Sequence, residues 1–229
     1  MALLIIGGTG EAKLLAQQLY LTLKTNEVEI IYSIAGLVRS PELPCRVVSG
    51  GFSQFGGLLA FIKANAVMAI IDVTHPFASE MSATAAQVCR QCGLPYWRYQ
   101  RPQWQPTAED DWQLFDDWKN LLQAVKGKHS LLLTVGQLPQ DVLRYFASAG
   151  KQKQLLRSAV KPASALTNNM QWMQAIGPFA LADEVALMQQ NGIDALLSKM
   201  SGGAATQAKL IAARQLGIPV YLLARPKLE

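Results

Sequence analysis

The sequence predicts an α/β fold with two domains and mainly parallel sheets. Three observations predict it. Short aliphatic runs recur along the chain and are typical of strands buried on both faces. Most of these runs are followed by apolar residues at helical spacing, which is the rhythm of βαβ units. Glycines stand at strand-to-helix turns in both halves. We therefore expect two Rossmann-like domains with a cleft between them.

The chain opens on a strand, a glycine turn and a helix. Leu3–Ile6 is a run of four large aliphatic residues, and apolar residues at helical spacing predict a helix over 10–23. Glycine lets backbone amides approach a phosphate, and a helix start favours an anion. The turn matches only part of the G-x-G-x-x-G fingerprint. Two interpretations stay open, a plain turn or a pyrophosphate site formed by Gly7, Gly8, Thr9, Gly10 and Glu11.

The second strand, 27–34, ends without an acidic residue. An acid at this position would favour NAD, because it would bind the ribose hydroxyls. The tip has Ser33, Ala35 and Gly36, and Arg39 follows. Small residues with an arginine favour a 2′-phosphate, and so NADPH, although NADH stays possible. The alternative is that Arg39 is a solvated loop charge.

A fourth strand, 67–73, leads into Thr74, His75 and Pro76, and an alanine-rich helix follows to about Cys92. It comes after a short third strand, 45–48, a second glycine cluster, 50–57, and a helix that begins near Leu58. Open α/β sheets bind ligands at the carboxyl ends of their strands. We therefore expect Thr74 and His75, with Asp72, at a site; alternatively Asp72 and Thr74 cap the helix and His75 packs in the turn.

After a fifth strand, 94–99, prolines, tryptophans and acids replace the βα rhythm. We expect a nucleotide-binding domain over 1–100, a linker over 101–126 and a second, substrate-side domain over 127–229. Strands of the second domain are expected at 130–134, 154–160, 170–176, 195–198 and 220–223, and helices at 138–147, 183–190 and 204–216.

A second possible anion site follows the strand at 195–198. Ser201, Gly202 and Gly203 precede a helix, and Lys199 stands beside them. Backbone amides at such a turn and a lysine can together hold an anion. A capped helix after a tight turn is the alternative.

The composition narrows the function classes. The net charge is +5, but the basic residues are scattered, which disfavours nucleic-acid binding. The apolar runs are too short for a membrane span, and the first residues lack the pattern of a signal peptide, so a cytoplasmic protein is expected. Three cysteines, with only one C-x-x-C pair, predict neither a disulfide framework nor a metal site.

Several strings, in this order, resemble the precorrin-6A reductase and cobalt-precorrin-6A reductase family of cobalamin biosynthesis. They are Gly7-Gly8-Thr9-Gly10-Glu11-Ala12, Gly50-Gly51-Phe52, Asp72-Val73-Thr74-His75-Pro76-Phe77-Ala78, Gly177-Pro178-Phe179, Lys199-Met200-Ser201-Gly202-Gly203, and Ala212-Ala213-Arg214 through Gly217-Ile218-Pro219-Val220 to Arg225-Pro226. The resemblance implies a reductase that transfers a hydride from NADPH or NADH to a double bond of a corrin-ring precursor, a polycarboxylate derived from a tetrapyrrole. With the composition above, no nucleic-acid or membrane partner is expected, and a monomer or small homo-oligomer is expected.

The resemblance also implies roles for particular residues. The Thr74-His75-Pro76 turn would lie near the cofactor, and His75 or Lys199 would donate the proton to the reduced ring. Substrate carboxylates would be held by basic side chains, including Arg214, and glycine-rich turns; the expected substrate residues are Gly51, Phe52, Lys199, Ser201, Gly202, Gly203 and Lys209.

Two other functions are compatible with such a fold. One is a methyltransferase that uses S-adenosylmethionine, which would favour an acid at the tip of the second strand. The other is a regulatory protein that senses a dinucleotide without turnover.

Overall fold

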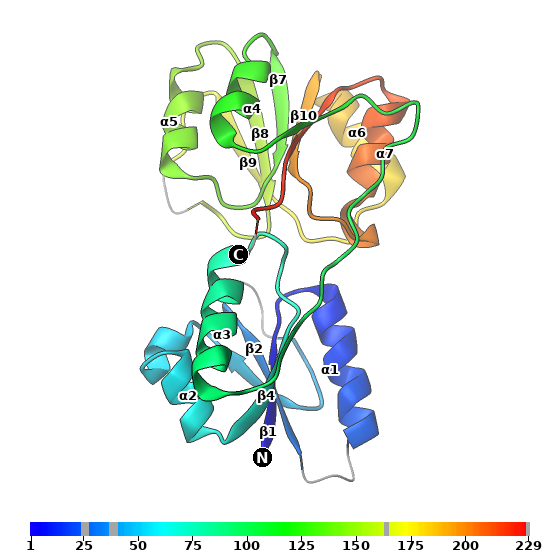
Figure 1. Cartoon of the computed structure of the whole chain (residues 1–229). Coiled ribbons are helices and arrows are strands. Elements are labelled where there is room, and N and C mark those ends of the chain that lie inside the picture. Colours follow the sequence, from blue (N-terminus) through cyan, green and yellow to red (C-terminus); the bar gives the residue numbers. More distant parts are fainter. Residues whose placement is uncertain (24–27, 37–40, 163–164, 228–229) are drawn as a thin grey trace. The chain divides into compact units, whose positions relative to one another are not determined.

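The computed structural model of the chain has two α/β units, as the sequence predicts (Figure 1). The structure describes residues 1–23, 28–36, 41–162 and 165–227. The first unit comprises Met1–Gln100 together with the segment that begins at Pro226. The second unit comprises Arg101–Arg225. Each unit has its own parallel sheet, called sheet A and sheet B here.

The first unit alternates strands and helices. Its elements are β1 (Ala2–Ile6), α1 (Gly10–Leu23), β2 (Glu29–Ile34), β3 (Arg46–Ser49), the 3₁₀ helix η1 (Phe52–Phe55), α2 (Leu58–Ala64), β4 (Val67–Asp72), α3 (Ser79–Cys92) and β5 (Tyr96–Arg98). Sheet A has the order β3-β2-β1-β4-β5, so the chain moves outward from β1 in one direction and then returns to its other side. This is the strand order of a Rossmann-like sheet.

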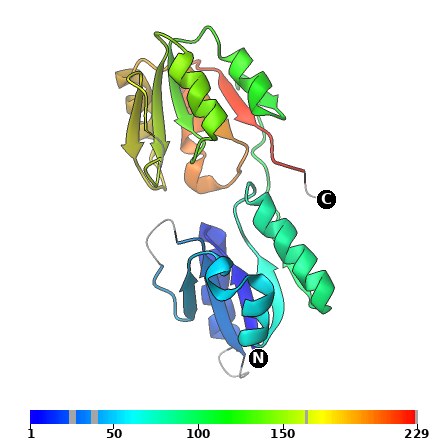
Figure 2. The ribbon, with the colours of Figure 1, turned by 90° about the vertical axis from the view of Figure 1, so that its left-hand side faces the viewer.

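Sheet A is buried on both faces, which explains its aliphatic strands. Leu4 and Ile6 of β1 pack in one cluster with side chains from α2 and α3, whereas Ile5 packs in another with side chains from α1. Successive side chains of a strand point to opposite faces, so an uninterrupted apolar run supplies both clusters. The ribbon shows α1 on one side of the sheet and α3 on the other (Figure 1; Figure 2).

The second unit repeats this plan with one extra strand. Its elements are β6 (Trp112–Phe115), α4 (Trp118–Ala124), β7 (Ser130–Thr134), α5 (Gln140–Ser148), β8 (Lys153–Ser158), β9 (Met170–Gln174), α6 (Leu181–Gln190), β10 (Ala195–Lys199), the 3₁₀ helix η2 (Ala204–Thr206), α7 (Ala208–Gln215) and β11 (Val220–Leu223). Sheet B has the order β6-β11-β10-β7-β8-β9. Strands β7 to β11 therefore follow the same 3-2-1-4-5 order as β1 to β5.

The stretch expected as a linker, 101–126, differs from the prediction. It contains β6, which pairs with β11 at the edge of sheet B, and α4, whose start is capped by the Asp117 side chain. The β6 strand is short and leaves Leu114 exposed, so it lacks the aliphatic signal of a buried strand. The helix expected at 204–216 is also divided, because η2 precedes α7.

Candidate functional site

The carboxyl ends of three strands of sheet A lie level with one another. In the register of the sheet, Ile6 at the end of β1 pairs with Ser33 of β2 and with Asp72 of β4. The strand that follows β1 is added toward one edge of the sheet, and the strand that follows β4 is added toward the other edge. The switch in strand order therefore falls between β1 and β4. Ligands of open α/β sheets bind at such a switch point. The Gly7–Gly10 turn and the Thr74–Pro76 turn both begin there.

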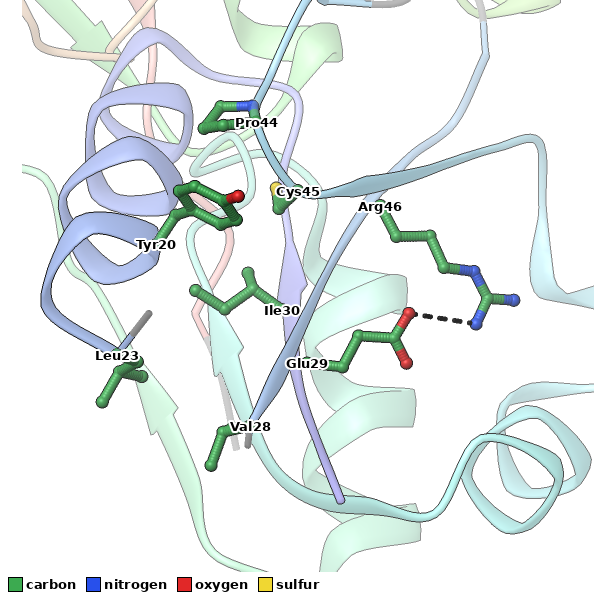
Figure 3. Close-up of a pocket in the computed structure, with 8 residues that line it drawn as sticks. All are labelled: Tyr20, Leu23, Val28, Glu29, Ile30, Pro44, Cys45 and Arg46. Atoms are coloured by element: carbon green, nitrogen blue, oxygen red, sulfur yellow. Dashed lines mark ion pairs between the residues drawn. The ribbon is translucent and has the colours of Figure 1, made fainter. Parts of the chain in front are cut away.

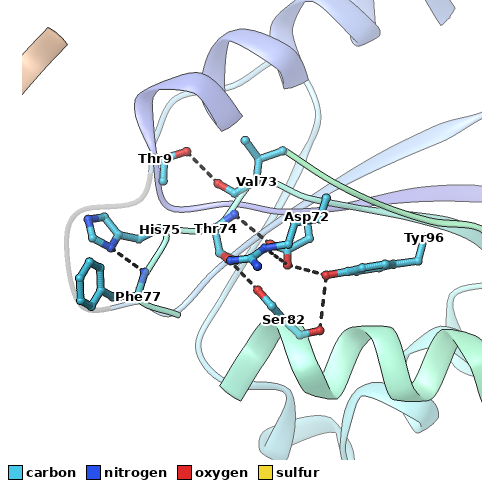
Figure 4. Close-up of polar contacts among 9 residues, drawn as sticks. Thr9, Asp72, Val73, Thr74, His75, Phe77, Ser82 and Tyr96 are labelled. Carbon is cyan, nitrogen blue, oxygen red and sulfur yellow. Dashed lines mark hydrogen bonds and ion pairs between the residues drawn. The ribbon is translucent and has the colours of Figure 1, made fainter. Parts of the chain in front are cut away.

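Thr9 connects these two turns. Its hydroxyl donates to the carbonyl oxygen of Val73 at 2.8 Å and accepts from the N–H of Ala12 at 3.2 Å (Figure 4). The second bond caps α1 and the first ties that cap to the end of β4. Thr9 is 7% exposed. The Thr9 side chain therefore stabilises the two turns through these hydrogen bonds and is too buried to face a ligand.

Tyr32, on β2, contacts the glycine turn from the interior of the first unit. Its hydroxyl accepts a hydrogen bond from the N–H of Gly8 at 3.0 Å, and its side chain is completely buried. Burial raises the pKa of this phenol, although the bond from Gly8 opposes the shift. A Cβ on Gly7 would overlap the Tyr32 ring. The glycine at position 7 is thus required by packing, a reason that the sequence did not reveal.

Gly8 and Gly10 differ from Gly7, because both are exposed and a Cβ on either would meet no atom within 4 Å. Gly8 has φ +103°, a conformation that favours glycine. Gly10 is the first residue of α1, and Glu11 follows it half-buried. Open space above two glycines at a helix start is the geometry that a phosphate group needs.

The tip of β2 is the next part of this edge. Ser33 is buried, and its carbonyl oxygen accepts from the N–H of Gly7 at 2.8 Å. Ala35 and Gly36 are exposed beyond it. Gly36 has φ +74°, and a Cβ there would press on the backbone of Gly50. Arg39 lies outside the described residues, so its expected role stays a sequence-based prediction.

Asp72 is fully buried and organises the turn after β4 (Figure 4). One carboxylate oxygen accepts from the N–H of Thr74 at 2.9 Å, and the other accepts from the Tyr96 hydroxyl at 2.7 Å. Arg98 Nε lies 3.6 Å from the same carboxylate. Burial and the bond to Asp72 raise the pKa of Tyr96. Asp72 therefore holds the Thr74 turn and does not cap α3, whose first residue is Ser79.

His75 points away from this buried network. It is exposed, and its Nδ1 accepts from the N–H of Phe77 at 3.3 Å. A neutral imidazole that accepts at Nδ1 carries its proton on Nε2. Pro76, the next residue, is buried. The Thr74 hydroxyl lies 3.4 Å from the Ser82 hydroxyl. The turn thus presents a histidine whose outer nitrogen is a hydrogen-bond donor.

Sheet B has its own switch point, between β7 and β10. The Thr134 hydroxyl at the end of β7 donates to the carbonyl oxygen of Leu197 at 3.2 Å, as Thr9 donates to Val73 in the first unit. Gly136 follows with φ +73°. This turn could not be predicted from the sequence, because one glycine after a strand is a weak signal. The Lys199–Gly203 loop begins at the other side of the same switch point.

The Lys199–Gly203 loop is packed more tightly than expected. Ser201 and Gly202 are buried. Gly202 has φ +69°, and a Cβ there would overlap the carbonyl oxygen of Pro102. Gly203 is half-buried with φ +87°, and Lys199 is half-buried with a pKa lowered by burial. The glycine at 202 is therefore required by backbone packing, while Lys199 and Gly203 retain exposed surface.

Three expected substrate anchors have positions that do not fit that role. Lys209 is 4% exposed, and its Nζ lies 5.3 Å from the centre of the Trp104 ring. Burial, and Arg157 nearby, lower the pKa of Lys209 to about 7. Arg214 Nε is paired with Asp110 at 2.9 Å. Phe52 packs in the core against Phe61, with ring centres 5.1 Å apart, although the adjoining Gly51 is exposed.

A pocket in the first unit lies at the opposite, amino ends of the strands (Figure 3). It has a volume of about 300 Å³ and includes Tyr20, Cys45 and an ion pair of Arg46 with Glu29 at 3.5 Å. Burial raises the pKa of the Cys45 thiol, which disfavours a reactive thiolate. None of the expected site residues lines this pocket.

Among the residues that the structure describes, no group of three or more histidine, cysteine or acidic side chains is placed to bind a metal ion. No helix in those ranges has the length and apolar character that a membrane crossing requires.

The fold and this site define a two-unit α/β protein with the strand order and glycine turn typical of nucleotide-binding sheets. A family model described as Precorrin-6x reductase CbiJ/CobK matches residues 2–229. The chain belongs to this precorrin-6x reductase family, as the sequence strings predicted.

Individual relatives agree with the family assignment. The precorrin-6A reductase of Rhodococcus erythropolis is 40% identical over 228 residues, which cover 99% of this chain and 90% of the relative. The cobalt-precorrin-6A reductase of Priestia megaterium is 26% identical over 244 residues, which cover 99% of this chain and 91% of the relative. The solved structure described as CobK precorrin-6A reductase matches with a TM-score of 0.85 and 33% identity, covering 100% of this chain and 90% of that chain.

Proposed function

We propose that this chain reduces precorrin-6A in cobalamin biosynthesis, with NADPH as the hydride donor. The observation that carries the proposal is the open glycine turn at the switch point of sheet A, in a chain that belongs to the precorrin-6x reductase family. The family supplies the reaction class. The turn supplies a place where a dinucleotide can be held.

The residues at the turn fit a pyrophosphate. A Cβ would enter open space at Gly8 and Gly10, so a ligand can come close to the backbone there. Thr9 already fixes Ala12 and the end of β4. The first turn of α1 would meet the diphosphate with the positive end of the helix dipole. The exposed residues Ala35 and Gly36 would lie toward the adenosine end, and Arg39 would favour a 2′-phosphate.

When bound, the reduced nicotinamide supplies a hydride to one carbon of a ring double bond, and the neighbouring carbon needs a proton. His75 is the proposed donor of that proton from Nε2, acting as an imidazolium that has taken up a proton at Nδ1 in place of the hydrogen bond from Phe77. Asp72 holds the turn that carries His75, through the N–H of Thr74. Lys199, whose pKa burial lowers, is the alternative donor.

The substrate side of the proposal rests on the loop after β10. Lys199 supplies a cation, and Gly203 has exposed backbone. Such groups suit the carboxylates of a polyacidic ring. Lys209 and Phe52 are left out of the substrate site, since both are buried in cores.

The comparisons favour the substrate without cobalt. The precorrin-6A reductases of Rhodococcus erythropolis and Mycobacterium tuberculosis H37Rv are 40% and 38% identical to this chain. The cobalt-precorrin-6A reductases of Priestia megaterium and Synechocystis are 26% and 27% identical. We therefore propose metal-free precorrin-6A as the preferred substrate.

The test is turnover by the purified protein. Precorrin-6A, with and without cobalt, is incubated with NADPH or NADH, and cofactor oxidation is followed together with the absorbance of the ring. Oxidation of NADPH with metal-free substrate is expected. No oxidation with either ring or either cofactor, under conditions where the Rhodococcus erythropolis enzyme works, would overturn the proposal. Tight binding of NADPH without turnover would indicate a dinucleotide sensor instead.

Three variants test the finer assignments. An Arg39→Ala variant should lose preference for NADPH over NADH, and an unchanged preference would remove the role of that arginine. Substitution of the proton donor should lower kcat by about 10²-fold or more while leaving cofactor affinity nearly unchanged. His75→Asn and Lys199→Met, compared in this way, identify which side chain donates.

A further inference from the structure

One arginine at the end of the second unit holds two segments that have no regular secondary structure. Arg225 Nε donates to the carbonyl oxygen of Met200 at 2.8 Å, and one Nη donates to that of Ser201 at 3.1 Å. The same guanidinium donates to the carbonyl oxygens of Arg101, at 2.5 Å, and Pro102, at 3.2 Å. Four carbonyl groups from distant parts of the sequence thus converge on one side chain.

The sheet register explains why Arg225 reaches this loop. Strands β10 and β11 are parallel neighbours, and Lys199 pairs with Leu223. The N–H of Met200 then donates to the carbonyl oxygen of Leu223 at 2.9 Å. The chain after β11 therefore runs beside the chain after β10, and Arg225 stands next to Met200 and Ser201.

Other contacts support the same loop from the segment at 101–104. Trp104 Nε1 donates to the carbonyl oxygen of Gly203 at 3.0 Å. Gly202 lies so close to the carbonyl of Pro102 that a side chain there would overlap it. The carbonyl groups of Met200, Ser201 and Gly203 are therefore all occupied by side chains of this unit.

The N–H groups of the loop, unlike these carbonyl groups, are only partly bonded to backbone carbonyls of the unit's described residues. Those of Met200 and Ser201 donate to the carbonyl oxygens of Leu223 and Lys199. Within residues 1–23, 28–36, 41–162 and 165–227, no backbone carbonyl accepts a hydrogen bond from the N–H groups of Gly202, Gly203 or Ala204. Because each peptide is planar, fixing the carbonyl oxygen of one residue fixes the N–H of the next, so the bonds to Ser201 and Gly203 set the N–H groups of Gly202 and Ala204.

We infer that Arg225 is a positioning residue that sets the Met200–Gly203 loop before substrate arrives, so that the N–H of Gly202 is directed at a substrate carboxylate. The inference rests on the proposed function, which places the substrate at this loop. A guanidinium suits the task, because five donors in a planar fork can serve four carbonyls in different directions. A lysine has three donors at one point and could serve only part of the set.

The test combines hydrogen exchange and kinetics on Arg225→Ala and Arg225→Lys. Amide exchange should become faster at 101–104 and 200–206 in Arg225→Ala, while β7 and β10 keep their protection. The KM for precorrin-6A should rise about tenfold or more, since hydrogen bonds from a charged group are lost. The KM for NADPH should change by less than about twofold, because the proposed cofactor contacts lie at the Gly7–Gly10 turn. Millimolar guanidinium should partly restore slow exchange at 200–206 and the KM for precorrin-6A in Arg225→Ala. In both measurements Arg225→Lys should lie between Arg225→Ala and wild type.

Gln152→Leu is the matched control. The Gln152 side chain also holds two backbone carbonyls, those of Val125 and Lys128, at 3.0 and 2.9 Å. These carbonyls precede β7 and lie at the amino ends of the strands, away from the loop. Gln152→Leu should lower thermal stability without changing the KM for precorrin-6A or exchange at 200–206.

The other possible results of these experiments also show whether Arg225 positions the loop. If Arg225→Ala behaves like Gln152→Leu, with lower stability and unchanged exchange at 200–206, Arg225 is only a stabilising residue and the inference is wrong. If Arg225→Ala does not fold, the same comparison is made with Arg225→Lys. If the wild-type protein reduces no precorrin-6A, the proposed function fails, whereas the exchange data and guanidinium rescue still decide whether Arg225 sets the loop.

Discussion

The Tyr32 hydroxyl accepts a hydrogen bond from the N–H of Gly8 at 3.0 Å, beneath the glycine turn. The tyrosine ring also lies where a Cβ of Gly7 would be, so the two residues exclude any larger side chain at that position. One backbone donor of the turn is therefore used within the protein. The turn is shaped by its contact with Tyr32 of β2, and its outer face is formed by Gly8 and Gly10.

Replacing Tyr32 by phenylalanine should loosen the turn. The N–H of Gly8 loses its partner while the ring still packs against Gly7, so stability should fall by about 1 kcal/mol. The KM for NADPH should rise about three- to tenfold, because the turn must then be ordered on binding. Urea unfolding and steady-state kinetics measure the two effects. Tyr145→Phe, which removes a hydroxyl bond to Leu122 in the other unit, should change stability alone.

Gly10→Ala should separate ligand binding from folding. Position 10 lies in the first turn of α1, has no positive φ and has no neighbour within 4 Å of a Cβ. The unfolding midpoint should stay the same or rise, since alanine favours a helix. The Kd for NADPH, measured by calorimetry, should rise about tenfold or more because the methyl group takes the place of a phosphate. Gly127→Ala, an equally open position, is the control, and unchanged binding in Gly10→Ala would place the diphosphate elsewhere.

Tyr96→Phe should destabilise the first unit. It removes the bond from the phenol to the buried carboxylate of Asp72, and bonds to a charged group contribute about 1.5–3 kcal/mol. Asp72 also holds Thr74, so kcat should fall as the His75 turn becomes less ordered. Unfolding in urea and turnover are the measurements. Tyr99→Phe, at an exposed tyrosine nearby in the sequence, should have neither effect.

The buried Lys209 should make stability depend on pH. The pKa of Lys209 falls from its ordinary 10.5 to about 7 in the folded chain, because burial and Arg157 lower it more than Glu184 raises it. Between these two values the unfolded chain binds more protons at this residue, so stability should rise as pH increases from 7 to about 10. Lys209→Met should be more stable than wild type at pH 7, and the difference should shrink toward pH 10.

Urea unfolding at pH 7 and 9.5 tests that prediction. Lys119→Met, at an exposed position in α4 of the same unit, is the control for the loss of a lysine. Its effect should be equal at the two pH values. A difference between Lys209→Met and wild type that does not change with pH would show that Lys209 is not the group responsible.

Much of the fold could be predicted because buried parallel strands are recognisable. The helix expected over 10–23 begins and ends at those residues, and the strands expected at 130–134 and 220–223 have the same bounds in the structure. The strand β6 was missed because it is a short edge strand whose Leu114 is exposed. An edge strand needs no aliphatic run on both faces, so it leaves little trace in the sequence.

The site was only partly predictable. The glycine turn, Thr74 and His75 stand at the carboxyl edge because their place after a strand determines it. Tyr32 was not found, since its role depends on the neighbouring strand and not on a local motif. Lys209 and Phe52 were expected at the substrate, but the packing of α7 and η1 buries both. Charge and residue type alone do not reveal which face of a helix is covered.

The two α/β units, the family and the glycine turn can be predicted from the residues alone, because hydrophobic period and glycine position are local properties of the chain. The reason for each glycine and the burial of particular charges become visible only in the folded chain. Gly7 is explained by Tyr32, Gly202 by Pro102, and the loop after β10 by Arg225. These relationships join residues far apart in the chain, and they arise from close packing of neighbouring strands and loops.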